Sequence, residues 1–364
     1  MNNKIESIHH LRGFAALLVV MYHISGTLNN VYAQADLGSL LFGSGASGID
    51  LFFMISGFIM VFSTERMESS AVSKFAVRRF FRLYPAFIAS LILYQIITIP
   101  DFAWTSFIKS SLFLPVTFDG TAPFFGYNLL YPAWTLLFEC VFYIIFGVSI
   151  AISHKHRMLI CSLLVMAMCL SLQMHMDGRI SLSGIHVQND INVSFVSGML
   201  RVLSSPMFYH FVIGMMMAKI YIYFSCRDFS DRARSLLKHI AFALISFYLV
   251  CYFAKYKGEI GMDGFGFWAL AVLSGALIYN LLGISVKSAT LDYLGEISYS
   301  LYLTHVVVIG FMNRFAEQIT IYPESIGIPR FMLLLFLSVL FASLMYHAVE
   351  KPFIKFGKKV VSRI

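Results

Sequence analysis

Long apolar segments alternate with short polar connections along almost the whole chain. A helix of about 18 to 22 apolar residues can cross the roughly 30 Å hydrocarbon core of a bilayer. The pattern therefore predicts an all-α polytopic membrane protein with about ten transmembrane helices. The predicted spans are 9–28, 49–64, 82–100, 132–152, 157–175, 205–224, 238–254, 264–283, 297–315 and 329–349.

One further apolar stretch, Trp104 to Leu114, is too short to span and predicts a re-entrant or interfacial helix. The longest connections expected on the outer side, 101–131 and 176–204, mix Gly, Pro, aromatic and polar residues, as a substrate-facing surface would. No internal repeat, low-complexity tract or soluble appendage is visible. Residues 1–364 are therefore expected to form a single integral-membrane domain.

Composition separates this chain from soluble proteins. Hydrophobic residues make up 59% and charged residues 13%, whereas a soluble domain carries about 25% charged residues. The net charge of +8 would suit a nucleic-acid partner. However, the basic residues lie between apolar segments and form no patch, so membrane topology explains them better and no nucleic-acid partner is expected.

The positions of the 27 Lys and Arg residues predict the orientation. With the N-terminus inside, 20 of the 27 lie on the cytoplasmic side and seven on the outer side. Both termini are therefore expected to be cytoplasmic. Lys4, Arg12 and the later Ala33-Gln34-Ala35 also fit a signal peptide. A retained first helix is preferred because its apolar stretch is long and contains His23.

The five cysteines have no metal-ligand spacing, and four of them lie inside apolar segments. An odd, membrane-embedded set argues against a disulfide framework. Free thiols and no metal site are expected. The cysteines are Cys140, Cys161, Cys169, Cys226 and Cys251.

The first span carries two polar side chains on one face. Arg12 and His23 are 11 residues apart, which on a helix places them about 20° apart in angle and about 16 Å apart along the axis. A bilayer penalises such residues unless they have a function. This face is therefore predicted to form half of an active site.

Other ionisable groups converge on the depth of His23. Glu139 lies about 20 Å from the inner side, close to the depth of His23. Asp50 lies near the outer end of the second span, and His305 lies midway along the ninth. One polar cavity lined by these groups would suit deprotonation of a hydroxyl, with imidazole as base and a carboxylate orienting the ring.

The alternative is that His23 and His305 only form hydrogen bonds across a helix interface. His210 and His347 lack comparable neighbours in the sequence, so a packing role is expected for both.

A basic run at Arg78, Arg79 and Arg82 begins the third span. Arg79 and Arg82 are three residues apart and share one helical face. The run could be a positive-inside anchor or a phosphate clamp, because arginine offers a bidentate fork to phosphate. With Arg12 it would form a cytoplasmic phosphate site beneath the histidine. A coenzyme A thioester, with a phosphorylated head and a long reactive arm, would span the two.

The glycine-rich stretch 43–48 falls on the predicted outer side, which argues against a nucleotide-binding loop. The following Ser56 and Gly57 are expected to allow close helix packing.

Six short motifs occur in order along the chain. They are Arg12 and His23 separated by ten residues; Gly48, Asp50, Phe52, Phe53, Ser56, Gly57 and Phe58; Arg79, Arg82 and Pro85; Trp134, Leu136, Glu139, Phe142 and Tyr143; Ser298, Tyr299, Tyr302 and His305; and Glu350 with Pro352. Together they resemble the bacterial integral-membrane acyltransferase-3 family, which includes O-acetyltransferases of surface polysaccharides.

The resemblance covers essentially the whole chain, with some departures. Thr135 stands where the family often has Ser, Cys140 where it often has a second Glu or Gln, and Val307 where it often has Pro. No extracytoplasmic SGNH esterase-like domain is fused, so the chain looks like a stand-alone member.

The resemblance implies transfer of an acyl group, usually acetyl, from cytoplasmic acyl-CoA to a sugar hydroxyl of a surface or lipid-linked polysaccharide. It implies a multi-pass protein of the bacterial inner membrane, in contact with membrane lipid, and leaves a homo-oligomer open. It also leaves open whether His23 is a base or carries the acyl group; a base is preferred. The predicted catalytic residues are His23, Glu139 and Asp50, the donor-binding residues Arg12, Arg78, Arg79 and Arg82, and further candidates Ser56, Trp134, Tyr302, His305 and Glu350.

Two alternatives remain at this point. The same polar residues could line the pathway of a transporter or flippase for an anionic or lipid-linked substrate. A membrane scaffold would use them for stability alone.

Overall fold

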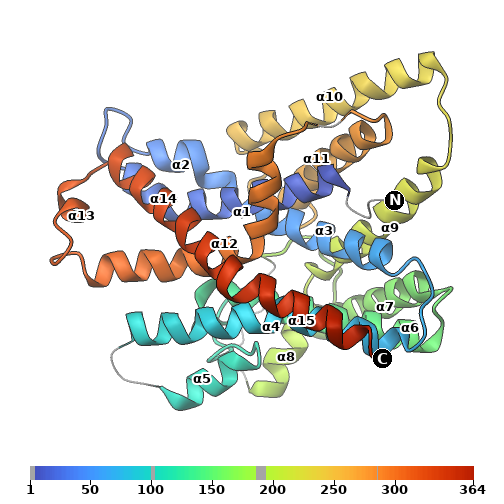
Figure 1. The fold of residues 1–364 in the computed structure, drawn as a ribbon, viewed down its shortest axis with the longest axis horizontal. Coiled ribbons are helices and arrows are strands. Elements are labelled where there is room, and N and C mark those ends of the chain that lie inside the picture. Colours follow the sequence, from blue (N-terminus) through green and yellow to red (C-terminus); the bar gives the residue numbers. More distant parts are fainter. Residues whose placement is uncertain (1–4, 100–102, 186–193, 285) are drawn as a thin grey trace.

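The computed structural model describes residues 5–99, 103–185, 194–284 and 286–364. These residues form helices and connections without a strand (Figure 1). Lys4, residues 100–102 and part of the expected connection 176–204 lie outside the described residues. The helices are α1 (Glu6–Ile24), α2 (Leu37–Phe42), α3 (Ser47–Ser63), α4 (Ala71–Thr98), α5 (Trp104–Ser111), α6 (Trp134–Ile152), α7 (Arg157–Asp177), α8 (Phe195–Leu203), α9 (Phe208–Ser225), α10 (Asp231–Ala254), α11 (Phe265–Leu281), α12 (Ala289–Arg314), α13 (Ile321–Glu324), α14 (Ile328–Met345) and α15 (Lys351–Val361).

The expectation of an all-α polytopic membrane protein is confirmed. Within the described ranges, nine helical segments are long and apolar enough to span a membrane, and α11 is a shorter apolar helix of 17 residues that occupies the expected span 264–283. The nine segments are Glu6–Leu28, Leu37–Ser63, Ala71–Thr98, Tyr131–Ile152, Arg157–Asp177, Phe195–Ser225, Asp231–Ala254, Ala289–Arg314 and Ile328–Val361.

Several helices extend beyond their apolar segments. Helix α4 begins at Ala71 rather than near residue 82, so the arginine run lies within the helix. The last span continues past Met345 through a π-helical turn, Tyr346–Glu350, into α15. Hydropathy marks the part of a helix that faces lipid, whereas backbone hydrogen bonds continue the helix into the polar region. The short helix expected after Trp104 is α5, with eight residues.

Helices α1, α3 and α12 form the centre of the bundle. Helix α1 packs against both α3 and α12, α3 packs against α9, and α12 packs against α4 and α14. Helix α10 lies at the edge and packs mainly on α11 (Figure 1). The predicted site residues on α1, α3, α4, α6 and α12 are therefore brought to the middle of the molecule.

Both ends of the described chain lie toward the same end of the bundle (Figure 1). This arrangement agrees with an even number of spans. That this end faces the cytoplasm stays a prediction, and the two ends are called inner and outer below on that basis.

Close packing of α3 against α9 depends on two glycines. A Cβ atom at Gly57 would lie 2.2 Å from Phe211 O, and one at Gly214 would lie 1.9 Å from Met54 O. Backbones can approach this closely only where the side chain is absent. The packing role expected for Gly57 is thus confirmed, whereas Ser56 turns toward α6 and donates a hydrogen bond there.

The free thiols expected from the sequence are confirmed. Cys161, Cys169 and Cys251 are buried, Cys140 is half-buried and Cys226 is exposed.

Candidate active site

A cavity of about 360 Å³ lies between α1, α3, α4, α6, α12 and α15. Of the described residues, five cationic side chains line it together with one carboxylate, that of Glu139. The excess of positive charge favours an anionic ligand. The five cations are Arg12, Arg78, Arg79, Arg82 and Lys358.

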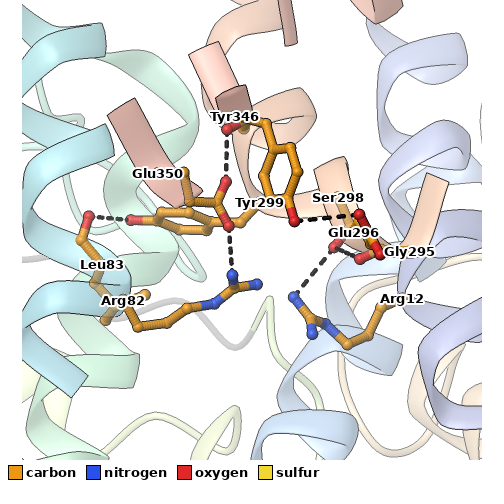
Figure 2. Close-up of polar contacts among 10 residues, drawn as sticks. Arg12, Arg82, Leu83, Gly295, Glu296, Ser298, Tyr299, Tyr346 and Glu350 are labelled. Atoms are coloured by element: carbon orange, nitrogen blue, oxygen red, sulfur yellow. Dashed lines mark hydrogen bonds and ion pairs between the residues drawn. The ribbon is translucent and has the colours of Figure 1, made fainter. Parts of the chain in front are cut away.

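Arg12 is held against the α12 helix. Its Nη2 donates to Ser298 Oγ at 3.1 Å (Figure 2). Ser298 is fully buried and donates in turn to Gly295 O at 2.9 Å. The half-buried guanidinium is thereby fixed at the wall of the cavity.

Arg82 forms an ion pair with Glu350, the last residue of the π-helical turn (Figure 2). The Glu350 side chain is 0% exposed, and its Oε2 accepts from Ser300 Oγ at 2.6 Å. A buried carboxylate is stable only when it is paired and hydrogen-bonded. Tyr299 completes the arrangement: its hydroxyl donates to Leu83 O at 2.8 Å, and its ring lies 5.7 Å from Arg82 Cζ.

Glu139 receives two hydroxyl donors at the cavity wall. Ser56 Oγ donates to Glu139 Oε1 at 3.0 Å, and Tyr143, one turn further along α6, also donates to this oxygen. The guanidinium of Arg79 lies 5.8 Å from the centre of the Tyr143 ring. Arg79 Nε is buried without a hydrogen-bond partner among the described residues. This donor has no protein partner in that part of the chain, and the Arg79 side chain lines the cavity.

Arg78 lies at the inner rim of the cavity and is paired with Glu68 at 2.7 Å. The hydrogen bond from Arg78 lowers the pKa of the Glu68 carboxyl below its ordinary value. Both side chains are about one-third exposed, so this ion pair is weak and a polyanionic ligand can compete for Arg78.

His23 and His305 meet in the outer half of the bundle. His23 Nδ1 lies 3.1 Å from His305 Nε2 and 2.9 Å from Val19 O. His305 is fully buried, with Nδ1 3.2 Å from Leu301 O. Among the described residues, the hydrogen-bond partner of His23 on another helix is thus an imidazole.

When both imidazoles are neutral, these contacts assign their protons. A carbonyl oxygen only accepts, so His305 Nδ1 carries a proton and its Nε2 is an acceptor. His23 Nδ1 faces two acceptors, Val19 O and His305 Nε2, and therefore carries a proton. His23 Nε2 is then unprotonated and can act as a base.

Tyr302 separates the histidine pair from the cavity. Its ring lines the cavity and lies 6.3 Å from the His305 ring and 5.5 Å from the Phe52 ring. Its hydroxyl is fixed 2.9 Å from Thr135 Oγ1 and donates to Pro132 O at 2.8 Å. Tyr302 therefore touches both the arginine-rich cavity and the histidines.

Trp134 does not reach the cavity. It is buried and packs edge-to-face on Phe124 and Phe138. The next residue, Thr135, lines the cavity instead.

The expected carboxylate partner of His23 is absent from its surroundings in the described residues. Glu139 binds Ser56 and Tyr143, and Asp50 lies elsewhere. Helical rise predicts the height of Glu139 and His23 in the membrane, but it does not predict their positions around the bundle. His305 occupies the place at which a carboxylate was expected.

Asp50 forms a second buried centre with His210. His210 Nε2 lies 2.7 Å from Asp50 Oδ1, and both side chains are 0% exposed. The same oxygen accepts from Gly261 N at 3.0 Å. The expectation that His210 lacks a charged neighbour was wrong, because its partner, Asp50, lies on another helix. His347 is exposed and stacks on Tyr293, in agreement with a packing role.

Lys358 and Tyr299 are cavity residues that the sequence did not single out as site residues. Tyr299 stood in the motif around His305 and could have been chosen because it lies three residues after Glu296 and three before Tyr302 on one helical face. Lys358 could have been found only by extending the last helix beyond its apolar part.

Residues of all six motifs thus lie at the cation-lined cavity or at the neighbouring histidine pair. A family described as an acyltransferase domain, acyltransferase 3, matches residues 5–347. The chain belongs to this family. It is a membrane acyltransferase, and it uses an acyl donor.

Curated relatives agree with this membership. The exopolysaccharide production protein ExoZ of Rhizobium meliloti is 25% identical over 87% of this chain and 92% of its own length. The acyltransferase MdmB of Streptomyces mycarofaciens is 27% identical over 39% of this chain and 38% of its own length. The Staphylococcus aureus protein named "Putative O-acetyltransferase SACOL0978" is 25% identical over 98% of this chain, which spans 58% of that protein. No solved structure matches the chain.

Proposed function

We propose that the protein transfers an acyl group, in the simplest case acetyl, from cytoplasmic acyl-CoA to a sugar hydroxyl of a cell-surface or lipid-linked polysaccharide. The names of ExoZ and of the staphylococcal relative support a polysaccharide acceptor and an acetyl group. A multi-pass location in the bacterial inner membrane would give one protein access to a cytoplasmic donor and an outward-facing glycan.

The observation that carries the proposal is the arginine-rich cavity. Coenzyme A combines several phosphate charges with a long flexible arm that ends in the thioester. Arginine forks suit the phosphates, and Arg78, Arg79 and Lys358 would hold them at the inner end. The arm would extend past Arg12 toward Tyr302, where the lining becomes aromatic.

The proposed step uses His23 as a base. His23 Nε2 takes the proton of the sugar hydroxyl while its oxygen attacks the thioester carbonyl carbon. The carbon–sulfur bond breaks, the ester forms, and the departing thiolate takes the proton from His23 to give free CoA. His305 holds the His23 ring in the required tautomer, the task that a carboxylate performs in other enzymes.

The two predicted carboxylates receive different roles. Glu139 would balance the cavity's positive charge and hold Ser56 and Tyr143 in place. Asp50 would stabilise the outer connection at Gly261 through its contact with the backbone. Both roles follow from the hydrogen-bond partners, and neither places a carboxylate on His23.

Mass spectrometry and NMR of the surface glycan from cells with and without the protein would test the proposal. The expected result is loss of one O-acyl group at one sugar position when the gene is deleted. Purified protein should also release free CoA in step with ester formation. Movement of a glycan lipid without CoA release would support the flippase alternative and contradict the proposal.

A further inference from the structure

Three tyrosines gather around the His23 ring. Tyr22 and Tyr131 contact it edge-to-face, with ring centres 5.3 Å and 5.4 Å away. Tyr127 packs on Tyr131 with ring centres 4.9 Å apart. Tyr22 and Tyr127 are each 39% exposed, so this cluster reaches the surface.

The cluster lies outside the arginine-rich cavity. None of Tyr22, Tyr127 and Tyr131 lines this cavity, whereas Tyr302, whose ring lies near His305, does. His23 therefore contacts an uncharged aromatic cluster that is distinct from the charged cavity. This arrangement separates a polyanionic ligand from an uncharged one.

The segment that carries Tyr127 and Tyr131 is held rigidly. Asn128, between them, is 3% exposed and its amide donates to Ser110 O at 2.9 Å. Its Oδ1 accepts from Leu130 N at 3.0 Å, and Tyr127 O accepts from Val116 N at 2.9 Å. Side chains on such a fixed segment are placed before a ligand arrives, which lowers the entropic cost of binding.

The Tyr127 phenol keeps its proton. Burial, and to a smaller degree the nearby Tyr22, raises the pKa of Tyr127 above its ordinary value. A neutral phenol can both donate and accept a hydrogen bond. A sugar ring matches this chemistry because it has an apolar C–H face and a rim of hydroxyls.

We propose that Tyr22, Tyr127 and Tyr131 form the acceptor-binding surface, on which one sugar ring of the glycan stacks with a hydroxyl directed at His23 Nε2. The proposal rests on the proposed function and adds where and how the acceptor binds. The competing explanation is an interfacial aromatic belt, in which tyrosines only anchor the protein at the membrane surface. An anchoring role at the membrane surface does not require the edge-to-face contact between Tyr131 and His23.

Acetyl transfer by purified protein in lipid nanodiscs would test the acceptor surface. The substrates would be radiolabelled acetyl-CoA and de-O-acetylated surface polysaccharide from the producing cells. Tyr127→Ala and Tyr22→Ala should each raise the polysaccharide KM by about tenfold, because each removes one aromatic face. The affinity for acetyl-CoA, measured by equilibrium binding, should change by less than about twofold.

Two further variants sharpen the test. Tyr127→Phe keeps the ring and loses the hydroxyl, so its KM should lie between those of the wild type and Tyr127→Ala. Tyr256→Ala is the matched control, because Tyr256 is also an exposed tyrosine, on the connection between α10 and α11, and belongs to no part of the site. Its KM should equal that of the wild type.

The outcomes separate this inference from the proposed function. If the wild-type protein transfers no acetyl group to the polysaccharide, the proposed function and the acceptor surface both fail. If the wild type is active but Tyr22→Ala and Tyr127→Ala keep its KM, the acceptor surface alone is overturned. Loss of membrane-inserted protein without a change in KM would assign the tyrosines to the aromatic belt.

Discussion

Arg79 and Arg82 enter the same cavity with different neighbours. Arg82 is neutralised by Glu350, whose other oxygen is held by Ser300. Arg79 has aromatic neighbours, Phe75 and Tyr143, and a buried Nε without a partner in the described residues. The charge of Arg79 is therefore the more available of the two for a phosphate.

This difference gives a prediction for donor binding. Arg79→Ala should weaken acetyl-CoA binding by about tenfold or more, since a charge-assisted hydrogen bond contributes about 1.5–3 kcal/mol. The loss should shrink as salt is raised, because salt screens the wild-type attraction. Isothermal titration calorimetry at two ionic strengths would measure both effects.

Arg232→Ala is the matched control, because Arg232 is an exposed arginine on α10, away from the cavity. Its affinity for acetyl-CoA should equal that of the wild type. An Arg79→Ala protein that binds acetyl-CoA as tightly as the wild type would leave Arg79 as a topology anchor only.

His23 shows how a single contact changes an interpretation. The sequence predicted an imidazole assisted by a carboxylate, but the imidazole of His305 occupies that position. A neutral imidazole orients His23 as a hydrogen-bond acceptor, without the negative charge that would stabilise imidazolium. A base that holds the proton only briefly and returns it to the leaving thiolate fits this arrangement.

Among the helices, the π-helical turn at Tyr346–Glu350 connects the last span to the cavity. A π-turn adds a residue to a helical turn and often occurs at functional sites. Here it places Glu350 against Arg82 (Figure 2) and Ser300. Helix α15 continues past the turn and brings Lys358 to the cavity. The closing Glu350 of the sequence motifs thus lies beside the cavity that we propose binds the donor.

The crossing of α3 and α9 gives a prediction at the scale of helices. Gly214→Ala should destabilise the protein, because the new Cβ would lie 1.9 Å from Met54 O and the helices would have to separate. Overpacking of this kind costs about 1–3 kcal/mol or more. Thermal unfolding in detergent would measure the effect as a lower midpoint.

Gly147→Ala serves as the control, because a Cβ there would lie 3.7 Å from the Phe75 ring, an ordinary van der Waals distance. Alanine also favours the helix more than glycine does. Its midpoint should equal or exceed that of the wild type. Equal midpoints for Gly214→Ala and the wild type would show that α3 and α9 do not pack this closely.

For the whole molecule, the sequence predicted the features that depend on one helix at a time. The spans follow from apolar length, and the shared face of Arg12 and His23 follows from helical spacing. Arg12, Arg79 and Arg82 were expected to meet, and they line one cavity. The roles assigned to these residues stay predictions.

The sequence could not predict how the helices are arranged around the bundle. Periodicity fixes an angle on one helix but not which neighbour that angle faces. The His23–His305 hydrogen bond was therefore only one of two alternatives, and the Asp50–His210 contact was missed. The polar continuations of α4 and α15 were missed because they carry no hydropathy signal. Tyr127 was missed because its place in the tyrosine cluster depends on how the connection between α5 and α6 folds onto α1.

The central claim is that donor binding and acyl transfer occupy two neighbouring parts of one protein. Transfer from radiolabelled acetyl-CoA to polysaccharide, measured beside acetyl-CoA affinity in wild type and His23→Ala, tests it most directly. The control is His347→Ala, which should be fully active because this exposed histidine lies on Tyr293.

His23→Ala should lower transfer by about 100-fold or more, as loss of a general base does, while acetyl-CoA affinity stays within about twofold of the wild type. Wild-type transfer by His23→Ala would contradict the account. A loss of transfer that is fully matched by a loss of acetyl-CoA affinity would contradict it too.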